Sequence, residues 1–201
     1  MSMAGPVLIR TYDAPPWDRR ETLRYAGVRE DTDAFDAELA ECTERLFGEL
    51  TYGVCYRELP VERDGACPAL CPEGTPPALA ARLFGCESVI LLAATVGLAP
   101  DRHMARLSAY PAKALWIQAA ATERVEALCD LFEAELGEEK RREGKSLLRR
   151  FSPGYGGLPL TLQKNLLAVL DGGRAIGLTL GENLLMSPTK SVTAMIGVKP
   201  Q

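Results

Sequence analysis

The chain has 201 residues, 47% of them hydrophobic and 25% charged, which is the composition of an ordinary soluble domain with a sizeable core. Its net charge of −4 argues against a broad surface for nucleic acid or for an anionic membrane. No apolar run reaches the length of a membrane span, and the start lacks a basic segment followed by an apolar core. We therefore expect a cytoplasmic protein with no membrane or nucleic-acid partner.

The first third of the chain predicts a short edge strand followed by helices. Val7, Leu8 and Ile9 form the candidate strand, and the following prolines end it. A short helix is expected over 18–25, and apolar residues at helical spacing predict another over 35–50, with an N-cap in Asp31–Asp33. We treat 17–50 as the helical part of the domain.

Strands and helices then alternate without a regular pattern. A strand is expected to begin at 54–56, and prolines at 76–77 open a small helix that reaches residue 84. Residues 88–95 are a continuous run of β-branched and aliphatic residues, typical of a central strand covered on both faces. Another helix opens near residue 100.

The strongest helical pattern runs from about 110 to 136, where apolar residues recur every three or four positions. Gly137 is expected to end this helix and to leave 138–145 as a solvated charged segment. Residues 146–151 then predict a strand, 162–170 a helix, and the alternating patterns at 176–180 and 192–198 two further strands.

These elements predict one α+β domain over residues 1–201, with a mixed or antiparallel twisted sheet and segregated helices. The sequence contains no internal repeat, no low-complexity tract and no linker. It also lacks the glycine patterns of phosphate-binding and dinucleotide-binding loops.

The cysteines and the only histidine of the sequence give little support for a metal site or for nucleophilic catalysis. Cys67 and Cys71 are close in sequence, but the third cysteine of a radical iron–sulfur triad would fall at Gly74. A zinc site would need ligands from other parts of the chain, so solvated or half-buried thiols in a loop are expected. His103 is the only histidine and is expected on a helix surface, so we predict neither a metal site nor a catalytic residue.

The stretch Arg150–Leu160 is the best candidate for a binding site. Ser152-Pro153-Gly154-Tyr155 suits a type II turn, with proline at the second position and glycine at the third. Arg150 offers a planar fork of donors for a carboxylate, and Tyr155 offers an aromatic face. These residues could hold a small zwitterion; the alternative is an ordinary tight turn between a strand and a helix.

Two motifs give the chain a resemblance to a known family. Arg150, Pro153, Gly154, Tyr155 and Pro159 form Arg-x-x-Pro-Gly-Tyr followed by a proline. The second motif, Met-x-Pro-x-x-Ser-Val, spans 186–192. In these motifs and their spacing, residues 150–198 resemble the S-adenosylmethionine-binding reactivation domain of cobalamin-dependent methionine synthase, and we treat 146–198 as the ligand-site part of the domain. The segments 21–27 and 94–97 are more similar to short free-standing members of the family.

The resemblance implies a fold like that activation domain and a role in reductive methylation of cob(II)alamin. It implies that Arg150 holds the carboxylate of S-adenosylmethionine, that backbone at Ser152, Pro153 and Gly154 meets its polar groups, and that Tyr155 lies by the adenosyl group. It further implies that the corrinoid belongs to a separate partner, a methionine synthase subunit. A flavodoxin-like or other donor would supply the electron. The chain would then be one component of a methyltransferase rather than a complete enzyme.

The sequence departs from the family pattern after Tyr155. The usual Pro-x-Cys-Pro is replaced by Gly156-Gly157-Leu158-Pro159, which weakens the expected adenine contacts. Met186 and Ser191 could contact the ligand or could be purely structural. Two alternatives stay open: a scaffold that docks on a corrinoid protein without binding S-adenosylmethionine, and a reactivator of another corrinoid methyltransferase.

Overall fold

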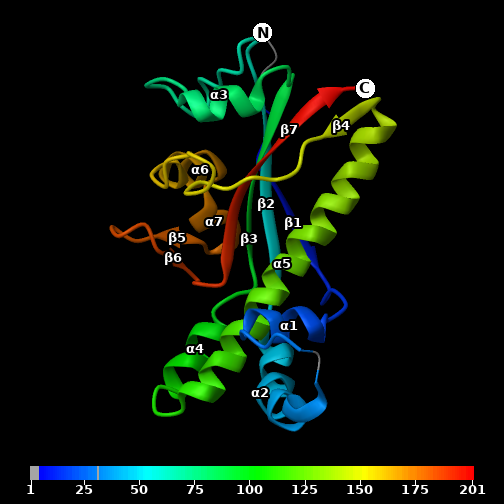
Figure 1. Ribbon diagram of the computed structural model, residues 1–201. Coiled ribbons are helices and arrows are strands. Elements are labelled where there is room, and N and C mark those ends of the chain that lie inside the picture. Colours follow the sequence, from blue (N-terminus) through cyan, green and yellow to red (C-terminus); the bar gives the residue numbers. More distant parts are fainter. Residues whose placement is uncertain (1–4, 31) are drawn as a thin grey trace.

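A computed structural model describes residues 5–30 and 32–201 and is built around a five-stranded antiparallel sheet (Figure 1). The strand order is β1-β2-β3-β7-β4, and a separate ribbon pairs β5 with β6. The strands are β1 (Leu8–Tyr12), β2 (Tyr52–Pro60), β3 (Ser88–Thr95), β4 (Lys145–Leu147), β5 (Thr179–Leu180), β6 (Met186–Ser187) and β7 (Ser191–Pro200). The predicted α+β class is confirmed, and the sheet is antiparallel rather than mixed.

Strand β3 lies at the centre of the sheet, and all eight of its residues are buried. It pairs with β2 from Gly53 opposite Thr95 to Pro60 opposite Ser88, and with β7 along its other side. One face of this central region packs on helix α5, and the other packs on α6 and α7. The continuous apolar run in the sequence therefore reflects burial on both faces.

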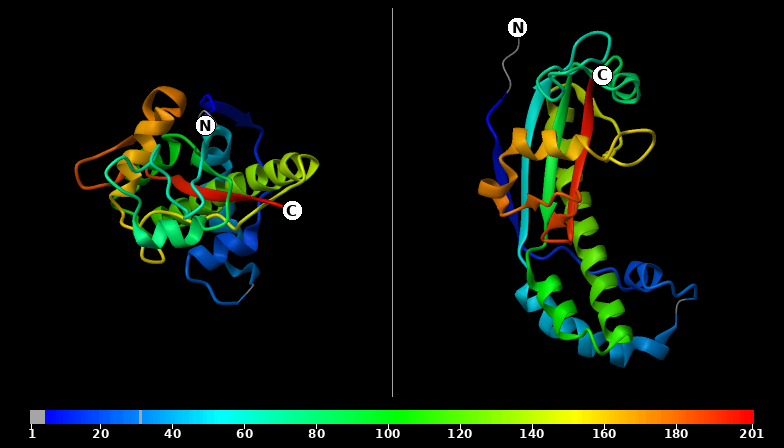
Figure 2. Two further views of the ribbon diagram at one scale, coloured as in Figure 1. Left: turned by 90° about the horizontal axis from the view of Figure 1, so that it is seen from above. Right: turned by 90° about the vertical axis from the view of Figure 1, so that its left-hand side faces the viewer.

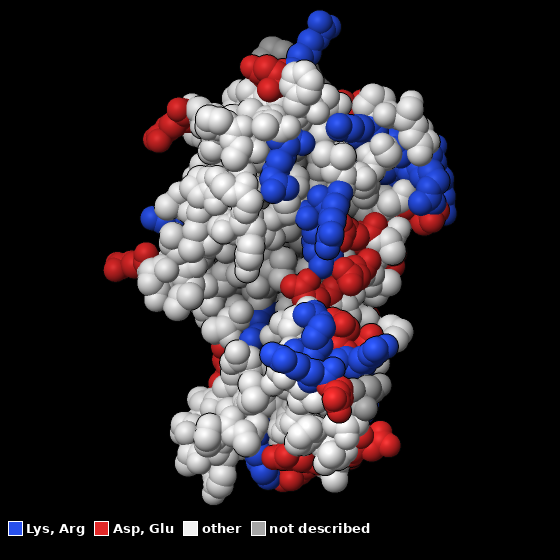
Figure 3. Space-filling view, viewed as in Figure 1, with Lys and Arg blue, Asp and Glu red and all other residues white. Residues whose placement is uncertain are grey.

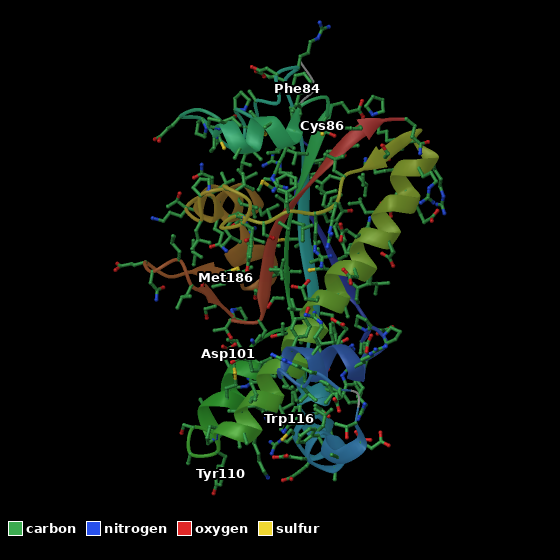
Figure 4. All side chains as sticks on the ribbon, viewed as in Figure 1. Phe84, Cys86, Asp101, Tyr110, Trp116 and Met186 are labelled. Atoms are coloured by element: carbon green, nitrogen blue, oxygen red, sulfur yellow. The ribbon has the colours of Figure 1, made fainter. Side chains whose placement is uncertain are left out.

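Helix α5 (Pro111–Arg142) is 32 residues long and joins the two ends of the molecule. Its C-terminal half packs Val125, Leu128, Phe132 and Leu136 against the sheet. Its N-terminal half lies among α1 (Arg19–Tyr25), α2 (Asp36–Glu49) and α4 (Ala99–Arg106), which gather below the sheet (Figure 1). Trp116 is buried in this helical end (Figure 4).

The opposite face of the sheet carries α3 (Pro77–Leu83), α6 (Leu162–Leu170) and α7 (Gly172–Ile176). Leu79, Leu83, Leu166 and Leu170 pack with inward-facing residues of β2 and β3. The right-hand view of Figure 2 shows that the loop after β4 and the α1 segment project toward the same side of the molecule.

Three predictions about the elements were wrong. Helix α5 continues through Gly137 to Arg142, because Lys140 binds Glu58 of the sheet and ion pairs support its last turns. Strand β4 is only Lys145–Leu147, and Phe151 makes an isolated bridge to Met195. The expected strand at 176–180 is reduced to β5, because residues 172–176 form α7 instead.

Other local expectations have mixed outcomes. Asp18 caps α1 through its side chain, and Thr32 caps a 3-10 turn at Asp33–Phe35, whereas Asp31 lies outside the described residues. Cys67 and Cys71 are buried in the core rather than solvated or half-buried. Within residues 5–30 and 32–201, no group of three or more His, Cys, Asp and Glu side chains is placed to hold a metal ion.

A polar contact at the end of α5 predicts how stability depends on pH. Lys140 donates to Glu58 Oε2 at 2.9 Å, and Ser88 donates to Oε1. Burial alone would raise the pKa of Glu58, but these hydrogen bonds and the Lys140 charge hold it below its usual value. Because the folded-state pKa is lowered, the stabilisation is present at neutral pH and is lost as pH falls below roughly 4.3.

Thermal unfolding of the wild type and of Glu58→Gln between pH 7 and pH 3 checks this prediction. We expect the wild type to be the more stable protein at pH 7 and the gap to close as the carboxylate protonates. A gap that stays constant over this range would contradict it.

Candidate functional site

The side chain of Arg150 lies against α5 and is held there by three carboxylates. Its Nη1 donates to Asp130 Oδ1 at 2.6 Å and to Glu133, and its Nη2 donates to Glu126 Oε2 at 2.6 Å. Burial disfavours its charged form, but the bond to Asp130 and the other nearby negative charges raise the pKa above the usual arginine value. Arg150 is therefore a permanently charged and firmly placed guanidinium.

The three carboxylates come from one stripe of α5. Residues 126, 130 and 133 are spaced by four and then three positions, so their side chains share one face of the helix. These residues lie outside the apolar stripe of the helix and were not among the predicted site residues. The helical spacing of the three carboxylates can be seen in the sequence. The sequence does not show that they bind Arg150, which lies 17 to 24 residues away.

A groove of about 540 Å³ lies beside this cluster. Its walls come from the segment before α1, from α1, from α5 and from the segment that follows β4. It is lined by Pro15, Pro16, Asp18, Glu21, Tyr25, Glu123, Glu126, Ala127, Asp130, Leu131, Arg149 and Arg150. Figure 3 shows acidic side chains gathered in the middle of this side of the molecule, with basic side chains above and below them.

A buried ion pair in α5 fixes the wall of the groove that precedes α1. Arg124 and Glu123 are 2% and 3% exposed and bind each other. Arg124 also donates to the carbonyl oxygens of Pro15 at 2.6 Å and Pro16 at 2.8 Å, and Glu123 accepts from the Asp18 backbone N–H at 3.1 Å. The pair thus ties an irregular segment to α5 and places Asp18 at the groove.

The predicted turn after Arg150 is present. Tyr155 N–H donates to the Ser152 carbonyl at 3.3 Å, and Gly154 has a φ of +86°, as a type II turn requires. The Gly154 N–H is used within the loop, where it donates to the Leu158 carbonyl at 3.0 Å. Pro153 is buried, whereas Tyr155 is 76% exposed.

The structure therefore brings only part of the predicted site together. Arg150 lines the groove, but the set of residues that lines it contains none of Ser152, Pro153, Gly154 and Tyr155. Arg150 and Phe151 point to opposite faces of the sheet, since Phe151 packs in the core with α3 and α6. Whether the four turn residues contact a ligand stays a prediction.

The departure at Gly156 has a steric explanation. Gly156 has a φ of +58°, and a Cβ built there would lie 2.1 Å from Nη2 of Arg82. Arg82 in turn stacks over the Phe151 ring, with its Cζ 5.2 Å from the ring centroid. Proline, the residue of the family pattern, is fixed near φ −65° and could not adopt this backbone. The positive φ of Gly156 therefore excludes proline, whereas the Arg82 guanidinium is the end of a flexible side chain and can shift.

The residues of the second motif, at 186–192, make contacts that stabilise the fold. Ser191 is buried, and its hydroxyl lies 2.8 Å from both Thr95 Oγ1 and the Pro188 carbonyl. Thr189 donates to Asp101 of α4, which connects the start of β7 to the helical end (Figure 4). Met186 is half-buried and packs against the core. Of the two roles considered for this motif, these contacts favour the structural one.

Comparisons with known proteins give a match in structure but none in sequence. No family model matches the chain, and no curated protein matches its sequence. Among solved structures, the chain is similar to one described as the crystal structure of the MetH reactivation domain bound to AdoHcy, with a TM-score of 0.69 and 15% identity. The match covers 98% of this chain and 79% of the other. The chain therefore has the fold of that reactivation domain.

The described part of the chain also contains no helix that is both long and apolar enough to cross a membrane.

Proposed function

We propose that this protein binds S-adenosylmethionine in the groove beside Arg150. The observation that carries the proposal is the charge arrangement there, a fixed guanidinium within a row of carboxylates on α5. S-adenosylmethionine carries a carboxylate, an ammonium group and a sulfonium, so it needs one cationic partner and several anionic ones. The resemblance in fold to a reactivation domain bound to AdoHcy supports the same ligand class.

The donor set of Arg150 fits the carboxylate of such a ligand. Its hydrogen bonds to α5 use Nη1 twice and Nη2 once. Among the described residues Nε has no partner, so the edge formed by Nε and the second hydrogen of Nη2 has donors left for a carboxylate. S-adenosylmethionine, when bound, would supply the methyl group, and this chain would bind and orient it.

We further propose that the chain is a reactivation subunit for a separate corrinoid protein, with a split cobalamin-dependent methionine synthase as the partner. Cobalamin would be held by that partner, and a flavodoxin-like or other donor would provide the electron. The motif resemblance in 150–159 and 186–192 supports this assignment. A partner from another corrinoid methyltransferase is the alternative, and co-purification with each candidate corrinoid protein distinguishes them.

One observation favours the alternative of a docking scaffold without S-adenosylmethionine. The guanidinium of Arg150 already binds three carboxylates of α5, and Tyr155 is exposed to solvent. A scaffold of this kind would associate with the corrinoid protein but show no heat of ligand binding.

Calorimetric titration with S-adenosylmethionine tests the ligand assignment. We expect Arg150→Ala to weaken binding at least tenfold, because a charge-assisted bidentate contact contributes about 1.5–3 kcal/mol. Arg150→Lys should also weaken binding, since lysine keeps the charge but loses the planar fork.

The matched control is Arg141→Ala on the exposed last turn of α5, where, among the described residues, the Arg141 side chain forms an ion pair only with Glu138. It should bind like the wild type. Absence of binding to the wild type, or equal binding to the wild type and to Arg150→Ala, would contradict the ligand assignment. Thermal unfolding of each variant shows whether it is folded.

A further inference from the structure

The groove carries more negative than positive charge, and the surplus lies on α5 and α1. Five carboxylate side chains line it, against two guanidinium groups, Arg149 and Arg150. One of these carboxylates, Glu123, is neutralised by the buried Arg124. Of the other four, Glu21 is paired with Arg24, which leaves Asp18, Glu126 and Asp130 against the two cations.

Several of these carboxylate oxygens are free. Glu126 binds Arg150 through Oε2 and Asp130 binds it through Oδ1. Within the described part of the chain, Oε1 of Glu126 and Oδ2 of Asp130 make no hydrogen bond. The side chains of Glu126 and Asp130 are 37% and 70% exposed. Arg150 thus holds the two side chains in place by one oxygen each and leaves the other oxygen to a ligand.

We infer that Glu126 and Asp130 make the site selective for a cationic sulfonium over the neutral thioether that remains after methyl transfer. This inference rests on the proposed function and concerns how the same site distinguishes substrate from product. S-adenosylmethionine and S-adenosylhomocysteine share the adenosyl and amino-acid groups. They differ by one methyl group and one unit of positive charge, because loss of the methyl cation leaves its bonding electron pair on sulfur.

The surplus of negative charge in the groove attracts S-adenosylmethionine more strongly than S-adenosylhomocysteine, because only the former carries a positive charge on sulfur. The ammonium and carboxylate are common to both ligands, so their contacts with the carboxylates and with Arg150 cancel in a comparison. The remaining Coulomb attraction acts only on the sulfonium, and it is substantial at a partly desolvated surface. The same attraction disappears when the methyl group leaves, so the geometry favours release of the spent ligand and entry of a fresh one.

Calorimetric titrations with three probes test the inference, namely S-adenosylmethionine, S-adenosylhomocysteine and sinefungin, which carries an ammonium group in place of the sulfonium. We expect the wild type to bind S-adenosylhomocysteine at least tenfold more weakly than S-adenosylmethionine, equivalent to about 1.4 kcal/mol. Sinefungin should bind with an affinity closer to that of S-adenosylmethionine than to that of S-adenosylhomocysteine. Raising sodium chloride from 20 to 200 mM should reduce the ratio between the two ligands, since salt screens exposed charges.

The double variant Glu126→Gln/Asp130→Asn removes both charges and keeps oxygen acceptors for Arg150. It should reduce the ratio of the two dissociation constants to below about threefold, because it weakens the cationic ligands more than S-adenosylhomocysteine. Glu138→Gln is the matched control, because Glu138 lies on the same helix outside the groove and pairs with Arg141. It should leave the ratio unchanged.

The outcomes separate this inference from the proposed function. If the wild type binds both ligands equally, or if the double variant weakens both by the same factor, selectivity by charge is overturned while ligand binding stands. If the wild type binds none of the three probes, the ligand assignment itself is overturned and the inference with it.

Discussion

Replacing Arg124 with methionine is expected to lower the free energy of unfolding by about 4 kcal/mol, because removing one partner of a buried ion pair leaves the other charge buried and unpaired. Glu123, the partner, is 3% exposed. The substitution also removes the donors to the Pro15 and Pro16 carbonyls. Urea denaturation at neutral pH, with an unchanged dependence on denaturant, measures the effect.

Two comparisons separate the buried pair from the loss of an arginine as such. Arg45→Ala removes a surface pair with Glu49, in which the Arg45 side chain is 73% exposed, and should cost less than about 1 kcal/mol. The double variant Glu123→Leu/Arg124→Met should recover part of the loss, since no charge is left buried. If Arg124→Met costs no more than Arg45→Ala, the pair does not anchor the segment before α1.

The second large effect is expected for Gly65→Ala, at about 3 kcal/mol. Gly65 has a φ of +87°, and a Cβ there would lie 2.0 Å from the backbone carbonyl oxygen of Ala80 in α3. Backbone atoms cannot move aside as a flexible side chain can, so α3 or the loop must shift. The strained backbone adds to this cost, because a left-handed conformation disfavours any residue with a Cβ.

Gly27→Ala is the matched control for this prediction. Gly27 has a nearly identical φ of +83°, but a Cβ there would meet no atom within 4 Å. It should therefore show only the backbone cost, about 1–2 kcal/mol. Chemical denaturation of both variants gives the difference, and equal losses would show that the contact with Ala80 is not limiting.

Much of the fold could be predicted because it depends on local patterns. The apolar stripe of α5 and the apolar run of β3 each identify an element whose core-facing residues are close in sequence. The turn at Ser152–Tyr155 follows from the intrinsic preferences of Pro153 and Gly154. Such features are determined by steric and hydrophobic preferences within a few residues, and the sequence by itself determined them.

The extent of α5, the short helix α7 and the groove were decided only by tertiary structure. Gly137 reads as a helix end, yet Lys140 reaches Glu58, 82 residues away, and the helix continues. Nothing in the helical pattern singles out Arg124, yet it binds carbonyl groups more than 100 residues away. The sequence identified Arg150 as a candidate ligand residue, but it could not show that α5 holds it with three carboxylates. A charged side chain binds the partner that the folded chain brings within a few ångströms of it. The residues next to it in the sequence do not indicate which partner that is.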